Sequence, residues 1–519
     1  MSRLILSLLV LVTIPAHAYA MEINEAGAQK LKSVFQGILD YEKVVTESMG
    51  GIELKYDGDL TVDMHEDYYT VTTPNIIIQE EGNTNPESAM TIGTFAINAM
   101  PDEKEGFWKT TITIPSSYTI TDEESFGFHI GEQNIVAMLD ERLGYFTKIN
   151  MNLSNIDLKQ NGEKFEIFDI GDIQFYINLE EDAEQGLYSG PGHFKITNIA
   201  IDDPSAFNTN TYEIGEFRFD MDTKGMKLPT LQEYQAKFEK HATTLEALYS
   251  TDQKIQEEID PNAVIEMFTD LYNFEMDGMS FAYSVKDATD TANSQDENRE
   301  YDAINLASAT LGFGFDGLAQ EKGSLNIKLG YDDFVISPTE EFRSTTMPND
   351  LNIDISALNI PYQSLIQMAQ TTMASVAQNP ESANMAGLGL MMRLPAILAQ
   401  SETQIVVENN GVKNDIYDLS LNGKVMTDLE SMIGFSAQFN AVFQGLDELF
   451  SVVKTETEKA NPPSEHQYYG FFTQLQKLKS IGVSETNESG KPAYSFNFET
   501  TPQGQMMING QDAMTVFSE

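Results

Sequence analysis

The amino-acid sequence predicts an α+β, β-rich fold with long, mainly antiparallel, curved sheets and amphipathic helices packed on one side of them. Two observations predict it. In much of the chain apolar and polar residues alternate with a period of two, as at Phe165–Ile177 and Tyr212–Met221, which is typical of half-buried strands. A few longer segments instead have apolar residues at every third or fourth position, which is typical of helices that cover one side of a sheet.

The first twenty residues have the three parts of a secretory signal peptide. Arg3 provides a positive charge, Leu4–Ile14 is a short apolar run, and Ala18-Tyr19-Ala20 is a cleavage site of small residues. The apolar run is too short to cross a bilayer of roughly 30 Å. We therefore expect cleavage after Ala20 and export into a bacterial periplasm.

An amphipathic helix is expected next, approximately over Ala26–Met49, because apolar residues recur there every three or four positions and two glycines follow. The strands after it are separated by expected turns. These turns lie at Asp57-Gly58, Asn161-Gly162 and Gly190-Pro191-Gly192. Trp108, the only tryptophan of the chain, lies in one of these strands and is expected in the core.

A short motif, Ile-Gly-x-apolar-x-apolar, recurs in the first half of the chain. Its copies begin at Ile92, Ile170 and Ile214, and their spacing is not constant. The motif therefore does not indicate a solenoid. It indicates one type of strand used several times, in which glycine permits a β-bulge or a close backbone approach where the strand begins.

The second half repeats the order of a helix followed by strands, which indicates an internal duplication. We divide the chain into a signal peptide (1–20), an N-terminal helix with a β-rich domain (21–228), a helical insert or linker (229–274) and a C-terminal α+β domain (275–519). The expected elements of the last domain are strands Met279–Val285, Leu311–Phe315, Leu325–Leu329 and Phe334–Ile336, a methionine-rich helical pair in Pro361–Gln400, strands Gln404–Glu408 and Tyr417–Leu421, helices Leu429–Glu456 and Tyr468–Ile481, and strands Tyr494–Glu499 and Gly504–Asn509. Asp287–Glu300 is expected to be a loop.

Composition excludes several classes of protein. The chain has no cysteine, which rules out disulfides, thiolate metal sites, a cysteine nucleophile and a lipid-modified cysteine. Its 80 Asp and Glu against 31 Lys and Arg give a formal net charge of −49. Such a chain repels nucleic acid and anionic lipid headgroups, because both require a positive surface. No second long apolar run is present, so no transmembrane segment is expected.

Metal and nucleophile motifs are incomplete. His65-Glu66-Asp67 resembles part of a metal site, but zinc needs three or four converging ligands, and we interpret it as a solvated strand end. Asp220–Gly225 begins like an EF-hand loop, yet Leu231 stands where the bidentate glutamate belongs. We interpret it as a hairpin turn and keep calcium as the weaker alternative; no other cofactor is expected. Tyr188–His193 holds a serine and a histidine, but its glycines favour a turn.

Methionine is concentrated in the predicted helical pair. Thioethers can bind Cu(I), but methionines on helices more commonly form an adaptable apolar surface. We therefore predict a surface for an apolar ligand such as an acyl chain. Its candidate residues are Met368, Met373, Met385, Met391 and Met392.

The C-terminal half resembles a known family. Arg393–Gln400, the strand Gln404–Glu408 and Leu421–Val425 resemble a passage of YdgA-like proteobacterial proteins, and so do the closing segments Tyr494–Phe498 and Gly504–Gly510. The resemblance implies an exported, β-rich envelope protein and no catalytic residues. It also implies a retained membrane anchor, where this chain has a cleavable signal. The strand texture is similar, by analogy, to AsmA-like proteins, which are associated with envelope lipid movement.

We therefore expect a non-enzymatic periplasmic envelope protein that binds or carries an apolar, lipid-like component or scaffolds envelope assembly. The alternative is a periplasmic hydrolase with a carboxylate acid/base pair, whose members would converge only in the fold. A purely structural or adhesive surface protein would need a sorting signal or exposed repeats, and neither is evident. The oligomeric state stays open.

Overall fold

The structure is a computed structural model that describes residues 23–48, 52–80, 89–120, 126–160, 163–164, 168–203, 210–249, 263–264, 266–267, 270, 275–292, 301–338, 341–378, 383–486 and 492–518. The predicted signal peptide and the predicted turn at Asn161-Gly162 lie outside these residues. The chain divides into two compact units. Unit 1 comprises Met1–Phe165, Ile173–Glu180 and Leu228–Phe274, and unit 2 comprises Glu166–Asp172, Glu181–Lys227 and Glu275–Glu519.

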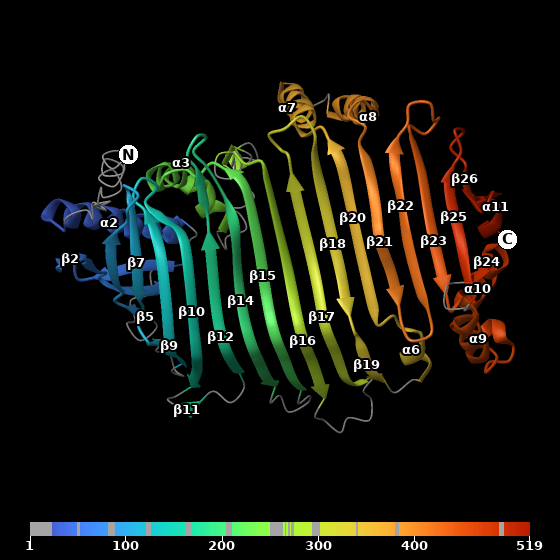
Figure 1. Ribbon diagram of the computed structural model, residues 1–519, viewed down its shortest axis with the longest axis horizontal. Helices are drawn as coiled ribbons and strands as arrows, with labels where there is room; N and C mark the ends of the chain where they lie inside the picture. The colour runs from blue at the N-terminus through green and yellow to red at the C-terminus, as the bar shows by residue number, and fades with distance from the viewer. Residues whose placement is uncertain are drawn as a thin grey trace, which may run out of the picture. The chain divides into compact units, whose positions relative to one another are not determined.

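Unit 1 combines two long helices with antiparallel strands (Figure 1). The helices are α2 (Glu25–Ser48) and α3 (Leu231–Tyr249). The strands are β1 (Ile52–Asp57), β2 (Thr61–Met64), β3 (Tyr69–Thr72), β4 (Asn75–Glu80), β5 (Met90–Gly93), β6 (Ala96–Pro101), β7 (Phe107–Thr113), β8 (Ser117–Ile120), β9 (Phe126–Asp140), β10 (Tyr145–Gln160) and β11 (Glu163–Lys164). Residues of β12 (Phe168–Asn178) and β13 (Glu180–Asp182) fall in both units.

The core of unit 1 lies between α2 and one face of its strands. Leu31, Phe35 and Leu39 recur every four residues along α2 and are buried, because this spacing places them on one side of the helix. They join one apolar cluster with Val71 and Trp108. The predicted helix and the predicted core position of the tryptophan are confirmed.

Unit 2 is built on long antiparallel strands that pair largely in chain order. They are β14 (Leu187–Asp203), β15 (Asn210–Met226), β16 (Gly278–Ala292), β17 (Tyr301–Asp316), β18 (Gly323–Asp332), β19 (Val335–Pro338), β20 (Asp350–Ile360), β21 (Gln404–Lys413), β22 (Asp418–Thr427), β23 (Phe435–Gln444), β24 (Val483–Thr486), β25 (Pro492–Thr500), β26 (Met506–Ile508) and β27 (Gln511–Asp512). The predicted β-rich, antiparallel α+β fold is confirmed.

The helices of unit 2 lie at the ends of the strands or beside the last of them (Figure 1). They are α6 (Glu341–Thr346), α7 (Tyr362–Gln378), α8 (Ala383–Gln400), α9 (Leu446–Thr457), the 3₁₀ turn η3 (Pro463–Glu465), α10 (Tyr469–Ile481) and α11 (Ala513–Ser518). The predicted helical pair corresponds to α7 and α8. In the described part of the chain, no helix has both the length and the apolarity needed to cross a membrane.

The glycine motif marks close backbone approaches, which was one of the two roles predicted for its glycine. Gly215 in β15 lies opposite Asp287 of β16, which has a left-handed φ of 52°. A Cβ atom on Gly215 would lie 2.9 Å from the Cβ of Asp287, so the close approach requires glycine. Gly171 faces Asn198 in the same way. Gly93 differs, because it ends β5 and itself has a positive φ.

Two predicted turns are wrong. Gly190-Pro191-Gly192 lies inside β14, where a register shift between Tyr188 and Gly190 accommodates the proline. Asp220–Gly225 lies inside β15. Ligand positions 1, 3 and 5 of an EF-hand are two residues apart, and this spacing also places side chains on one face of a strand. The segment therefore extends a strand and closes no calcium loop.

The predicted helix Leu429–Glu456 is also wrong in its first part. Phe435–Gln444 forms β23, and a helix begins only at Leu446. Gly434 and Gly445, which bracket β23, both have positive φ angles. Of the expected loop Asp287–Glu300, residues 287–292 belong to β16, and residues 293–300 lie outside the described residues.

Candidate functional site

One face of the unit 2 sheet is apolar across seven strands, β15 to β18 and β20 to β22. The strand register brings apolar residues into rows that run across the sheet. One row passes through successive partners Met221, Phe281, Phe313, Ile327, Ile355 and Val407. We call this surface the apolar face; its residues include Phe217, Phe219, Met221, Phe281, Tyr283, Val285, Leu311, Phe313, Phe315, Leu325, Ile327, Leu329, Ile353, Ile355, Ile405, Val407 and Val425.

Aromatic rings form a continuous cluster on the apolar face. The ring centroids of Phe219 and Tyr283 are 4.7 Å apart, and those of Phe281 and Phe313 are 5.3 Å apart. Phe315 extends the cluster along β17, with its centroid 6.2 Å from that of Phe313. Such separations are those of interacting aromatic pairs. The rings therefore hold one another in place on the sheet.

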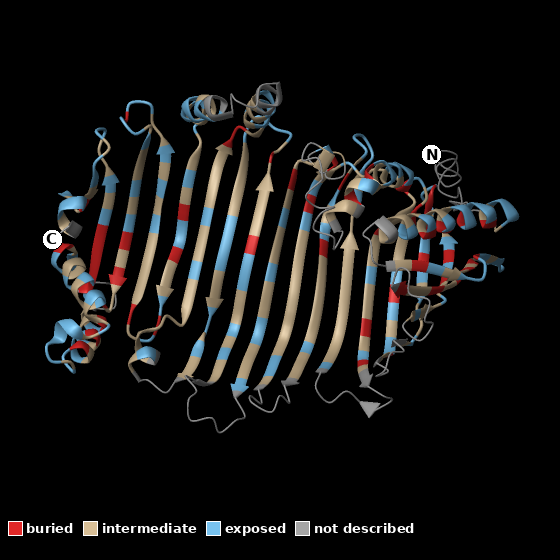
Figure 2. Ribbon diagram, turned by 180° about the vertical axis from the view of Figure 1, so that it is seen from behind, coloured by how far each residue is buried: buried red, intermediate tan, exposed pale blue. Residues whose placement is uncertain are grey.

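Among the described residues, no helix covers most of this face (Figure 1). Leu311 is 51% exposed, and Tyr283 and Ile405 are each 43% exposed. In both views β17, β18, β20 and β21 run without a helix across them, and exposed or intermediate residues predominate on them (Figures 1 and 2). Large side chains left in water in this way form a patch of the kind that marks an interaction site.

At the C-terminal end of the same face, helices cover the apolar side chains of the strands. Phe443 of β23 shares a row with Leu419 of β22 and Tyr494 of β25. There α9 and α10 pack over the strands, and Phe443 is only 6% exposed. The contrast with Leu311 shows that helices bury this part of the face, whereas several large apolar side chains further along it remain exposed.

The open part is large enough for acyl chains. Seven strands at a spacing of about 4.8 Å extend over roughly 29 Å. Four apolar rows, each two residues from the next, cover about 20 Å along the strands. The acyl chains of one leaflet occupy about half of the roughly 30 Å hydrocarbon core of a bilayer. A lipid with two chains therefore fits on this surface.

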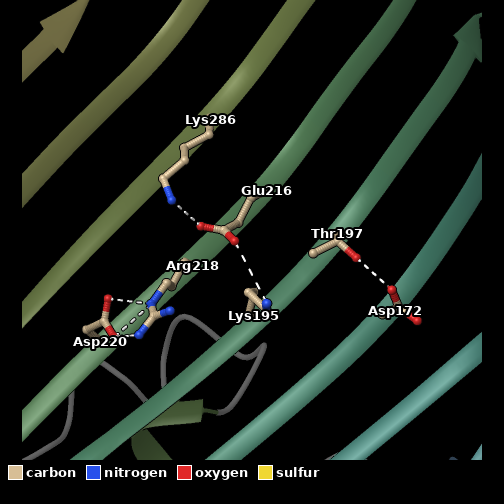
Figure 3. A network of polar contacts seen from close by, with 7 residues as sticks. All are labelled: Asp172, Lys195, Thr197, Glu216, Arg218, Asp220 and Lys286. Carbon is tan, nitrogen blue, oxygen red and sulfur yellow. Dashed lines mark hydrogen bonds and ion pairs between the residues drawn. The ribbon is translucent and has the colours of Figure 1, made fainter.

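The opposite face of the sheet carries paired charges (Figure 3). Glu216 accepts a 2.8 Å hydrogen bond from the Nζ of Lys286, and its other oxygen lies 3.9 Å from Lys195. Arg218 binds Asp220 through two nitrogens, at 2.6 and 2.8 Å. Glu216 faces lysines on both adjacent strands, so these opposite charges stabilise the strand pairing. Arg218 and Asp220 pair along β15 itself. This face is a solvated surface.

The paired carboxylates are poor candidates for a general acid. The Lys286 ammonium holds the pKa of Glu216 below its usual value, and Lys479 does the same for Asp447. A general acid that works near neutral pH needs a raised pKa.

A hollow of about 630 Å³ also lies on the charged face. Its lining includes Ala282, Gly312 and Gly314, together with the Arg218–Asp220 pair.

The two motifs that resemble parts of metal sites make other contacts in the structure. His65 stacks on the ring of Tyr68, with centroids 4.3 Å apart, and its Nε2 lies 2.9 Å from the hydroxyl of Thr70. The Asp220 carboxylate, which would be a ligand in a calcium loop, accepts a hydrogen bond from Arg218. Among the residues that the structure describes, no group of three or more His, Asp or Glu side chains could hold a metal ion.

The five candidate methionines lie on α7 and α8 and not on the apolar face. Met391 and Met392 are 71% and 75% exposed, and Met368 is half-buried. The side chains of Met373 and Met385 lie outside the described residues. Sequence reasoning identified the strands but missed the apolar face. The alternation of apolar and polar residues in Met279–Val285 and Leu325–Leu329 is the pattern that indicates this face.

Comparisons with known proteins give no relative for this chain. No protein-family model matches it. Neither a curated protein nor a solved structure matches it.

Proposed function

We propose that the protein is a non-enzymatic component of a bacterial cell envelope that binds or carries a lipid-like molecule, with its acyl chains against the apolar face of unit 2. The observation that carries this proposal is the exposure of large apolar side chains, such as Leu311 and Tyr283, on the same face of the sheet that α9 and α10 cover further along. Leaving each such side chain in water costs roughly 1–2 kcal/mol. A bound acyl chain removes that cost.

The signal-like N-terminus supports an exported location, most simply the periplasm. The composition supports the choice of ligand. A formal net charge of −49 disfavours anionic partners. An acyl chain interacts with the apolar face without any charge, so the acidic surface does not oppose it.

Binding of a phosphatidylcholine with a fluorescent acyl chain to the purified, lipid-stripped protein tests the proposal. Leu311→Asp places a charge on the apolar face, and Thr310→Asp places the same charge on the next residue of β17, which points to the opposite face and is also exposed. We expect about tenfold weaker binding for Leu311→Asp, because an acyl chain would have to cover a carboxylate. Thr310→Asp should bind like the unaltered protein.

If the unaltered protein does not bind the lipid, or if the two substitutions weaken binding equally, the proposal is wrong. Circular dichroism of both variants establishes that each retains its strands. Scaffolding of envelope assembly or a hydrolase activity would then be the functions to test.

A further inference from the structure

A second apolar surface lies at one end of the unit 2 strands. β20 leads into α7, α8 leads into β21, and residues 428–434 join β22 to β23. Because neighbouring strands are antiparallel, these three connections lie at the same end of the sheet (Figure 1). We call the exposed apolar side chains gathered there the apolar tip; they are Leu388, Met391, Met392, Leu429, Met432 and Phe435.

The side chains of the apolar tip are unusually exposed for their type. Met432 is 81% exposed, Met392 is 75% exposed and Leu429 is 68% exposed. The connecting loop lies against α8, since the Thr427 hydroxyl donates a hydrogen bond of 3.4 Å to the carbonyl of Leu398. A Cβ atom on Gly434 would likewise lie 3.9 Å from the Cβ of Pro395. Helix and loop therefore present one surface.

Charged residues are scarce in this helical pair. α7 and α8 contain no Asp or Glu in their 17 and 18 residues, although the chain has 80 acidic residues in 519. Arg393 is their only charged residue. α8 is apolar on most of its circumference, and a helix of that kind is normally surrounded by protein or by lipid. Here the protein leaves much of it uncovered.

The apolar tip is continuous with the apolar face. Phe435, which is 41% exposed, begins β23 on the same side of the strand as Ala437. Ala437 is paired with Val425, and Val425 with Ile405, both on the apolar face. Apolar side chains therefore connect the apolar tip to the apolar face.

We propose that the apolar tip docks on the surface of a zwitterionic lipid monolayer, so that lipid passes between the membrane and the apolar face. The proposal rests on the proposed function and names the partner of the same site. Methionine and leucine side chains enter the boundary between headgroups and acyl chains, where their burial drives attachment. The acidic surface elsewhere keeps the protein off strongly anionic membranes.

Flotation of the purified full-length protein with phosphatidylcholine vesicles tests the docking. Met392→Glu and Met432→Glu should each lower the vesicle partition coefficient about tenfold, because each replaces a buried apolar contact by a charge. Met514→Glu is the matched control: Met514 in α11 is 77% exposed but lies outside the tip. It should change partitioning less than twofold. Adding anionic lipid to the vesicles should weaken flotation, and salt should restore it.

Flotation that is absent, or that Met514→Glu lowers as much as the two tip variants, would overturn the docking proposal. The assay is independent of the lipid-binding assay above. If the protein floats through its tip but Leu311→Asp leaves lipid binding unchanged, the docking stands and the proposed function fails. If lipid in detergent still binds but flotation is absent, only the docking fails.

Discussion

The rings of Phe219 and Tyr283 lie 4.7 Å apart on neighbouring strands, yet Tyr283 remains 43% exposed. In a protein core such a pair would be covered by a second layer. Here the two rings belong to a surface that keeps large apolar side chains exposed over several strands and is covered where α9 and α10 pack on it.

The covered part should determine stability. Phe443→Ala should lower the free energy of unfolding by about 3–5 kcal/mol, because it leaves a cavity beneath α9 and α10. Phe313→Ala makes the same change on the open part of the apolar face and should cost about 1 kcal/mol. Urea unfolding followed by circular dichroism measures both. Equal losses would mean that the open part is a core in its own right.

The close approach between β15 and β16 should depend on glycine. Gly215→Ala should lower the free energy of unfolding by about 1–3 kcal/mol, because its Cβ would come within 2.9 Å of the Asp287 Cβ. Gly470→Ala, in α10 with open space around the added Cβ, should instead stabilise the protein by up to about 1 kcal/mol. Thermal unfolding of the two variants checks the opposite signs. Stabilisation by Gly215→Ala would exclude the close approach.

The contact between α9, α10 and β25 should depend on pH. Asp447 accepts hydrogen bonds from Lys479 at 2.5 Å and from the Tyr494 hydroxyl at 3.0 Å, and Lys479 in the first place lowers the pKa of Asp447. Since the pKa is lower in the folded state, its stabilisation is present above the unfolded value of about 3.9 and is lost as the pH falls through the folded value.

Asp447→Asn should therefore destabilise the protein at pH 7 and make little difference near pH 2. Urea unfolding at the two pH values measures this. Glu448→Gln, the next residue of the same helix turn, removes an exposed charge and serves as the control. A loss that is the same at both pH values would mean that the charge on Asp447 does not contribute.

Local patterns were sufficient for much of the fold. The period of α2, the alternation in the strands and the glycines of the repeated motif were all readable because each depends on neighbours in sequence. The helix predicted over β23 failed for a physical reason. Phe435, Phe439 and Phe443 are four residues apart, and a spacing of four places side chains together on a helix and also on one face of a strand. Only the pairing of this segment with β22 and β25 decides between a helix and a strand.

The candidate site was only partly predictable. The apolar character of α7 and α8 is visible in sequence, and so is the alternation in each strand. Whether a second layer covers Leu311 or Ile327 depends on where α9 and α10 pack, which no local pattern records. The sequence therefore predicts the methionines as the ligand surface, whereas we propose the sheet for the ligand and the helices for the membrane.

Native mass spectrometry of protein purified gently from its own cells shows whether lipid occupies the apolar face. We expect reproducible extra mass that organic extraction releases as lipid. Leu311→Asp should abolish this mass, and Thr310→Asp should keep it. A bare polypeptide mass for the unaltered protein, or extra mass that Leu311→Asp leaves in place, would show that lipid does not occupy the apolar face.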